Sequence, residues 1–145
     1  MRPGAPIQSD DSMATFQQKH PTAPSPKPRT SKRRGDDAED EALAFLQTQG
    51  LQLLQRNYRT PGRGGGEIDL IVRDRQGTVV FVEVRSRARI DHGGALASIS
   101  ATKRQRIVFA ARCYLGRMTQ LPPCRFDVVV VQAGELQWIK AAFGC

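Results

Sequence analysis

Apolar residues recur at helical spacing in two segments of the chain. The first, residues 36–50, has acidic residues in its first turn, where the helix dipole favours them, and a glycine at its end. The second, residues 100–116, also ends in glycine. The predicted inward faces are Ala38, Ala42, Phe45, Leu46 and Gln49 in the first helix and Ile107, Ala110, Ala111 and Tyr114 or Leu115 in the second.

Shorter segments rich in β-branched and aromatic residues alternate with turn residues, which predicts strands. The short turn 74–77 (DRQG) joins two of them as an antiparallel hairpin. Four consecutive valines, 128–131, indicate a strand buried on both faces, and therefore a central strand covered by helices. The predicted order is αβββαββ, a mixed α/β fold. The five strands are expected at 51–58, 67–73, 78–85, 125–132 and 136–143.

The first 34 residues differ in composition from the rest. They hold six of the nine prolines and seven of the 22 basic residues, against two of the 14 acidic ones, so they carry more than half of the net charge of +8. We predict a disordered, basic, Pro-rich tail over residues 1–34, with Met13 as an alternative start, and one folded domain over 35–145. The tail is either a cationic arm that attracts polyanions or a solubilising terminus.

Several classes of protein are disfavoured by the sequence. No apolar run reaches the roughly 20 residues of a membrane span, and the N-terminus lacks the apolar segment of a secretory signal, so we expect a cytoplasmic protein without a membrane partner. Cys113, Cys124 and Cys145 are odd in number and far apart, which favours neither a disulfide framework nor a zinc site. The histidines are His20, in the tail, and His92, so a Ser-His-Asp or Cys-His site would depend on His92 alone.

Carboxylates interrupt the predicted hairpin near its open end. Side chains alternate along a strand, so Asp69 shares a face with Glu67, and Glu83 shares a face with Arg85. These charges either lie on a solvated outer face, as is common in antiparallel sheets, or meet across the hairpin. Two carboxylates that meet repel each other unless a cation or a proton lies between them. An oxygen pair without His or Cys suits Mg²⁺ or Mn²⁺ rather than zinc.

The spacing of Asp69, Glu83 and Arg85 resembles the motif of the PD-(D/E)xK nuclease superfamily. Further segments match in order: the helix AE…A…L…G, then RNYR, GEIDLI, FVEVRSR, the KRQR helix, RFDVV and a terminal AF. Together they resemble the YraN family, small bacterial proteins of restriction-endonuclease-like fold that are described as candidate endonucleases. The resemblance covers residues 35–143. It implies a mixed five-stranded sheet flanked by helices and metal-dependent hydrolysis of phosphodiesters.

The resemblance also implies roles for individual residues. Asp69 and Glu83 would hold the divalent ion, Mg²⁺ or Mn²⁺, with the Val84 carbonyl nearby. Glu67 corresponds to the acidic residue of the family's GEID segment, and Lys103 to a lysine at the start of the second long helix. The implied catalytic residues are Glu39, Asp69, Glu83 and Arg85, and the implied metal site is Asp69, Glu83 and Val84.

Arg85 is the main departure from the superfamily pattern, which usually has a lysine there to orient or activate the attacking water. An arginine supplies positive charge, but a guanidinium stays protonated and therefore does not act as a general base. Arg85 therefore either supports catalysis through its charge or is an ion-pair partner of Glu83.

Basic residues flank the predicted centre and would contact the phosphates of a bound strand, although each is also an ordinary surface charge. Glycines 64–66 lack the Gly-Lys-Ser/Thr sequence and the following helix of a phosphate-binding loop. The candidates for nucleic-acid binding are Arg63, Arg87, Lys103 and Arg104, with Arg59, Arg89 and Arg106 also nearby in sequence.

Three functions are compatible with the sequence. The first is a Mg²⁺-dependent endonuclease on DNA, including branched or flapped DNA. The second is a nucleic-acid-binding module of the same fold without turnover, for which Arg85 is the strongest argument. The third is a protein-interaction domain, consistent with the modest net charge of residues 35–145. Substrate structure, cleavage position and oligomeric state stay open.

Overall fold

The computed structural model describes residues 31–86, 94–132 and 134–144. Its elements follow the predicted αβββαββ order of a mixed α/β fold, with one additional helical turn, α2, before the second long helix. The elements are α1 (Ser31–Thr48), β2 (Gln52–Arg59), β3 (Glu67–Arg73), β4 (Val79–Ser86), α2 (Gly94–Ala97), α3 (Ala101–Leu115), β5 (Cys124–Gln132) and β6 (Glu135–Phe143).

The main difference from the predicted bounds is at the first helix. α1 begins at Ser31, five residues before its predicted start, and so includes residues 31–34, which were assigned to the tail. The bounds of the strands and of α3 differ from the predicted ones by a residue at most, with Ser100 and Gly116 as the caps of α3. Its N-cap is Ser100, whose hydroxyl accepts a hydrogen bond from the Lys103 N–H at 3.1 Å. Residues 1–30 of the predicted tail lie outside the described residues.

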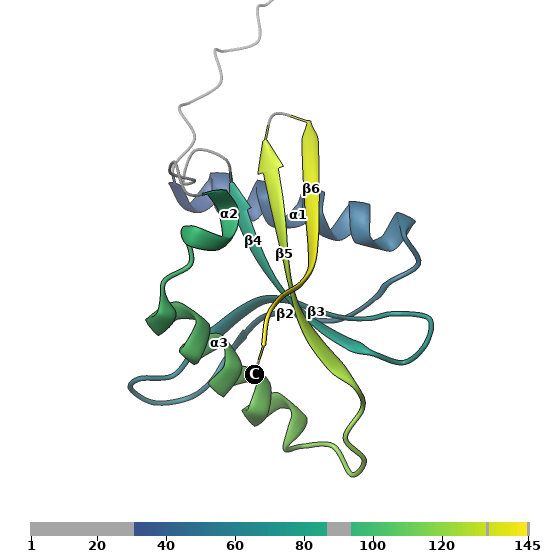
Figure 1. The fold of residues 1–145 in the computed structure, drawn as a ribbon, viewed down its shortest axis with the longest axis vertical. Coiled ribbons are helices and arrows are strands. Elements are labelled where there is room, and N and C mark those ends of the chain that lie inside the picture. The colour runs from purple at the N-terminus through teal and green to yellow at the C-terminus, as the bar shows by residue number, and fades with distance from the viewer. Residues whose placement is uncertain (1–30, 87–93, 133, 145) are drawn as a thin grey trace, which may run out of the picture.

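The strands of the described residues form one five-stranded sheet in the order β2-β3-β4-β5-β6. Neighbouring strands are antiparallel except β4 and β5, which pair in parallel from Val79–Cys124 to Ser86–Val131. A parallel pair needs a crossover connection, and the segment with α2 and α3 supplies it. Figure 1 shows the strongly twisted sheet with the two long helices lying apart on either side of it.

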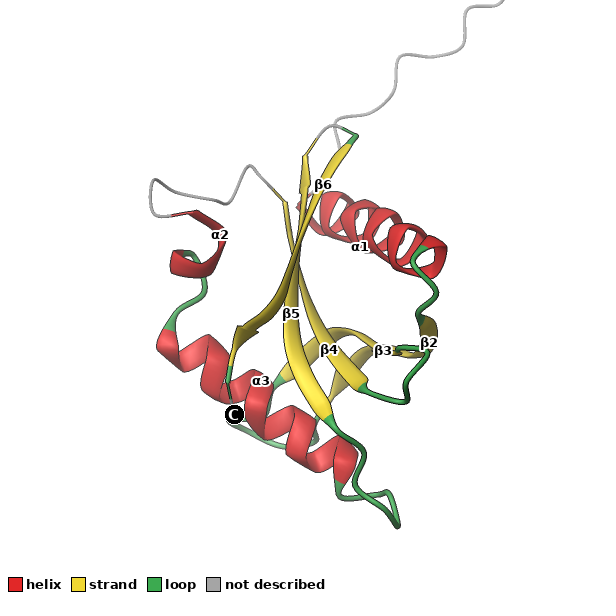
Figure 2. Ribbon diagram, turned by 45° about the vertical axis from the view of Figure 1, so that its right-hand side comes forward, coloured by secondary structure: helices red, strands yellow, loops and turns green. Residues whose placement is uncertain are grey.

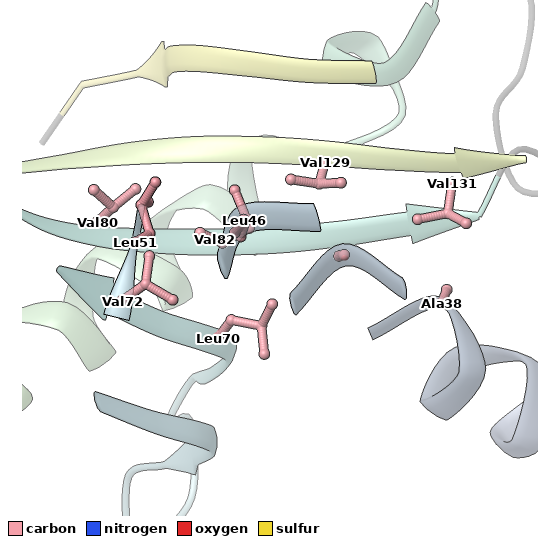
Figure 3. Packing of buried hydrophobic residues seen from close by; sticks show 10 residues of the cluster. Ala38, Leu46, Leu51, Leu70, Val72, Val80, Val82, Val129 and Val131 are labelled. Carbon is pink, nitrogen blue, oxygen red and sulfur yellow. The ribbon is translucent and has the colours of Figure 1, made fainter. Parts of the chain in front are cut away.

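Helix α1 covers one face of the sheet. Figure 2 shows it on the opposite side of the strands from α3. Three of its predicted inward residues, Ala38, Ala42 and Leu46, are buried, and Phe45 packs at the margin. The prediction for Gln49 was wrong: the helix ends at Thr48, so Gln49 lies past its last turn and is exposed. The buried sheet residues facing α1 are Leu70, Val72, Val80, Val82, Val129 and Val131 (Figure 3).

Helix α3 covers the other face through its predicted inward residues. Ile107, Ala110 and Ala111 are buried. The Tyr114 ring meets two rings edge-on, with centroids 5.4 Å from Tyr58 and 6.1 Å from Phe81. The small alanines let the helix approach closely, while the aromatic rings fill the space at its end.

Strand β5 is buried on both faces, as its four valines predict. Val129 and Val131 pack on the α1 side, while Val128 and Val130 pack with Ile99 on the opposite side. None of the four is more than 6% exposed. The strand is the fourth of five in the sheet, so both its edges are hydrogen-bonded as well.

The same strand carries a fully buried carboxylate, Asp127, which accepts its hydrogen bonds from groups of the same chain. It accepts hydrogen bonds from Arg125 Nε at 3.0 Å, Trp138 Nε1 at 2.9 Å and the Ala141 N–H at 2.9 Å. Ala141 has a φ of 51°, an uncommon conformation for a residue with a side chain, and lies where the β5–β6 register shifts. Asp127 thus holds the irregular end of β6 in place.

We expect Val129→Asp to lower the free energy of unfolding by about 3–5 kcal/mol, because it places an unpaired charge in the apolar layer beneath α1. Urea denaturation followed by circular dichroism measures the change. Gln132→Asp is the matched control, since it adds the same carboxylate at the exposed end of the same strand. Equal stability of both variants would contradict the burial of β5.

Candidate active site

The predicted carboxylates lie where β3 and β4 separate. The antiparallel ladder between these strands runs from Arg73–Val79 to Leu70–Val82 and then stops. At the next position Asp69 Oδ2 accepts a hydrogen bond from the Val84 N–H at 2.8 Å, so a side chain takes the place of a backbone acceptor. Glu83 remains in the parallel ladder with β5, opposite Val128. Asp69 and Glu83 directly follow the last ladder pair, so their side chains meet at the point where the strands separate.

Glu83 is almost completely buried, with its side chain 4% exposed. Its Oε2 atom lies 3.6 Å from Arg85 Nη1 and 3.7 Å from Lys103 Nζ, so two cations from different elements face one oxygen. Its Oε1 atom is buried and has no hydrogen-bond partner. A buried carboxylate oxygen without a donor is unfavourable, and among the described carboxylates Glu39 is the other one with such an oxygen.

Burial and mutual repulsion change the titration of both carboxyl groups. Burial raises the pKa of Glu83 to about 8, and the charge of Asp69 adds to this increase, whereas Lys103 and Arg85 oppose it. Burial also raises the pKa of Asp69, against the effect of its hydrogen bond from Val84. Near neutral pH, and with no cation bound, the pair therefore carries a proton.

A third carboxylate, Glu39 on α1, lies close enough to Asp69 for the two charges to interact. Burial, followed by the negative charge of Asp69, raises the pKa of Glu39 to about 7. Arg56 Nη2 lies 3.7 Å from Glu39 Oε1, which is an ion pair but too long for a hydrogen bond, and that oxygen has no hydrogen-bond partner. The Asn57 side chain also interacts with Glu39, from a backbone with a φ of 50°.

Arg56 and Asn57 were not predicted as site residues. The signal for them was the RNYR segment, which contributes to the family resemblance without giving either residue a role. An asparagine tolerates a positive φ better than most residues, and here this conformation lies within β2, close to Glu39.

Arg85 faces Glu83 with one nitrogen of its guanidinium, Nη1, while the other two bind Ser98. Its side chain is 17% exposed, and its Nη2 donates to the Ser98 carbonyl oxygen at 2.6 Å, while Nε lies 3.4 Å from the Ser98 hydroxyl. The guanidinium is thus held between β4 and the segment that follows α2. Ser98 was not predicted, because nothing in its local sequence marks it as a partner of Arg85.

The predicted nucleic-acid-binding residues divide into different groups. Lys103 reaches Glu83 and belongs to the site. Arg63 lies exposed in the loop after β2, whereas Arg87 lies outside the described residues. Arg104 instead donates to the Leu96 carbonyl oxygen at 2.8 Å and lies over the Phe143 ring, so its guanidinium binds its own chain.

The donor set fits a hard divalent cation. Asp69 and Glu83 supply carboxylate oxygens, and the partnerless oxygens of Glu83 and Glu39 are the kind that a cation or a proton would satisfy. Among the described residues, no three His, Cys, Asp or Glu side chains form a ready metal cluster. Mg²⁺ typically takes one or two carboxylates and keeps several waters, so two carboxylates are sufficient. Val84 contributes to this site through its N–H, which donates to Asp69. Two roles stay predictions: the Val84 carbonyl as a metal ligand, and Glu39 as a third carboxylate on the same ion.

Comparison with known proteins places this domain in a family. Residues 38–131 match the profile described as "Uncharacterised protein family UPF0102". A UPF0102 protein of Albidiferax ferrireducens is 67% identical over 114 residues, which cover 79% of this chain and 89% of the relative. One from Paracidovorax citrulli is also 67% identical over 79% of this chain and 84% of the relative. One from Cupriavidus pinatubonensis is 52% identical over 79% and 87%.

The protein is therefore a mixed α/β domain in which a buried carboxylate, Glu83, and a half-buried one, Asp69, lie where two strands diverge. It belongs to the UPF0102 family, which agrees with the resemblance to YraN-like proteins. The family description assigns no activity. None of the helices in the described part of the chain is long and apolar enough to cross a membrane.

The raised pKa values predict that the metal-free protein loses stability as the pH rises. Between about 4.5 and about 8, folded Glu83 retains a proton that the unfolded chain has released, so its contribution to the free energy of unfolding falls across this window. We expect Glu83→Gln to remove this loss and to be more stable than the wild type at pH 8.5 by about 1–3 kcal/mol. Urea denaturation in EDTA at pH 6 and 8.5 measures the difference.

Glu41→Gln is the control, because it makes the same chemical change at an exposed position of α1. It should leave the pH dependence of the wild type unchanged. A Glu83→Gln protein that is less stable than the wild type at pH 8.5 would mean that ionised Glu83 stabilises the fold.

Proposed function

We propose that the protein is a Mg²⁺- or Mn²⁺-dependent endonuclease that hydrolyses phosphodiester bonds in DNA. One observation supports this above the others: Asp69 and Glu83 are held together, so that near neutral pH they need a proton or a cation between them, and a buried Glu83 oxygen has no donor from the described chain. A domain has little structural reason to keep such a pair, since replacing buried charges by apolar residues is often neutral or stabilising. Perturbed carboxyl groups of this kind cluster at functional sites.

The residues of the chain divide the work between metal and substrate. Asp69, fixed by the Val84 N–H, and Glu83, fixed in the β4–β5 ladder, would hold the cation. Bound there, the cation would supply Lewis acidity, which polarises a phosphate and lowers the pKa of bound water. Glu39 lies near the pair and, with a pKa of about 7, is able to exchange a proton near neutral pH.

The positive charge that would meet the substrate comes from the two cations at Glu83 Oε2, Lys103 and Arg85. Lys103 is 39% exposed and therefore accessible to a phosphodiester, whereas Arg85 is held against Ser98. Placing a cation beside a developing phosphorane charge in a partly buried site is a large part of catalysis by phosphoryl-transfer enzymes. We choose DNA as the substrate in this proposal because the sequence resembles DNA-cleaving enzymes.

We expect Mg²⁺- or Mn²⁺-dependent cleavage when the protein is screened on single-stranded, duplex, flapped and four-way DNA. Asp69→Asn and Glu83→Gln should each lower the cleavage rate by about 100-fold or more, because each removes an anionic ligand, and calorimetry should show weaker metal binding. Glu41→Gln, exposed on α1, should cleave like the wild type. A folded wild type with no metal affinity in the presence of DNA and no cleavage would overturn the proposal.

A second candidate is a nucleic-acid-binding module that keeps the fold without turnover. The geometry of Arg85 favours it, since the guanidinium at the motif position is bonded to the Ser98 carbonyl and does not act as a base. In that case the carboxylate pair would be a remnant of a metal site, and DNA would bind without being cut.

Arg85→Lys separates the two candidates. If the protein is an active nuclease, its Arg85 is already engaged with Ser98, and we expect the lysine variant to cleave within about threefold of the wild type. An inactive wild type and an active Arg85→Lys variant would instead identify the missing ammonium as the reason for lost turnover. The readout is the initial cleavage rate on the best substrate of the screen, at equal metal concentration.

A further inference from the structure

A hollow of about 300 Å³ lies between the loop that follows β2 and the first turns of α3. Thr60, Gly65 and Gly66 line it from the loop, and Lys103 and Arg106 line it from the helix. Its volume is at the lower end of the range for ligand pockets, which suits a single backbone unit of a polymer rather than a large cofactor.

The loop wall of the hollow is held firmly in place. Buried Thr60 binds Gly66 twice: its N–H donates to the Gly66 carbonyl at 3.1 Å, and its Oγ1 accepts from the Gly66 N–H at 2.8 Å. A Cβ on Gly66 would lie 1.9 Å from the Arg106 carbonyl oxygen, so only glycine allows the loop to lie directly against α3. The loop and the helix face each other across a fixed distance, and the hollow is preformed.

The charge of this hollow is positive. Its lining has three cations, Arg59, Lys103 and Arg106, and one carboxylate, Glu67. Arg59 forms an ion pair with Glu67, with Nη2 3.2 Å from Oε1, and Lys103 lies 3.7 Å from Glu83, so Arg106 is the lining cation that no described carboxylate neutralises. An anionic ligand would be drawn toward Lys103 and Arg106.

Lys103 connects this hollow with the carboxylate pair. Its side chain lines the hollow, and its Nζ lies 3.7 Å from Glu83 Oε2. A phosphate in the hollow would therefore have a neighbouring phosphate of the same strand within reach of Asp69 and Glu83.

We propose that this hollow is a phosphodiester subsite. It holds the backbone of a nucleic-acid strand next to the phosphodiester bond that lies at Glu83. Lys103 belongs both to this hollow and to the carboxylate site. The choice of a phosphodiester as ligand rests on the proposed function, but binding in the hollow needs neither metal nor cleavage. Lys103 and Arg106 supply the phosphate contacts. Such contacts position a strand without reading its sequence.

The test is fluorescence anisotropy of a labelled oligonucleotide with the full chain in EDTA, at several salt concentrations. We expect Lys103→Gln and Arg106→Gln each to weaken binding by about 3–10-fold and to reduce the salt slope by about 1. Arg112→Gln is the control, because it removes the same charge from an exposed position of α3 outside the hollow, and it should change affinity less than twofold. Lys103→Arg should bind like the wild type, which separates loss of charge from loss of fold.

Three results would overturn the subsite. The first is equal affinity of the Lys103, Arg106 and Arg112 variants, which would indicate binding by overall charge alone. The second is Lys103→Arg binding as weakly as Lys103→Gln. The third is that polyglutamate displaces the oligonucleotide as well as unlabelled DNA does, since the hollow would then recognise anionic polymers in general. Because no metal is present, these binding measurements do not depend on whether the protein cleaves DNA. A protein that cleaves DNA can still give any of the three results that overturn the subsite.

Discussion

The parallel pairing of β4 with β5 is the constraint on which the rest of the structure depends. A parallel pair needs a crossover and cover on both faces, and α1 and α3 provide that cover through their alanine-rich faces. Glu83 lies within this pair, opposite Val128, so it is buried by the architecture and cannot turn to solvent as a charge on an edge strand could. The position of the carboxylate site thus follows from the same interaction that forms the core.

Two buried carboxylates on neighbouring strands show how structural and functional charges differ. Asp127 is completely buried, and each of its oxygens accepts hydrogen bonds from an arginine, a tryptophan or a backbone N–H. Glu83 is almost as buried, but one of its oxygens has no donor, and its closest cations lie 3.6 and 3.7 Å away. The first arrangement is complete without a ligand, whereas the second is improved by one.

Much of the fold was predictable because local patterns and tertiary packing agree. The valines of β5 and the stripe of α3 mark their buried faces directly. Contacts between distant segments were not predictable: the bond of Arg85 to Ser98 and the turn of Arg104 toward Leu96 depend on how α2 and α3 lie against the sheet. The proximity of Asp69 and Glu83 follows from hairpin register, while the approach of Lys103 required the placement of α3.

The chain contains a single tryptophan, and its surroundings make it a built-in optical reporter. The Trp138 indole donates to Asp127, meets the edge of Phe45 on α1 with centroids 5.9 Å apart, and has Lys140 Nζ 4.4 Å from its ring. Its emission therefore senses how α1 is seated on β6. Because α1 also carries Glu39, less than two turns before Phe45, a ligand that draws this carboxylate toward Asp69 would also move the Phe45 ring against Trp138. Intrinsic fluorescence would then report occupancy of the carboxylate site without any label.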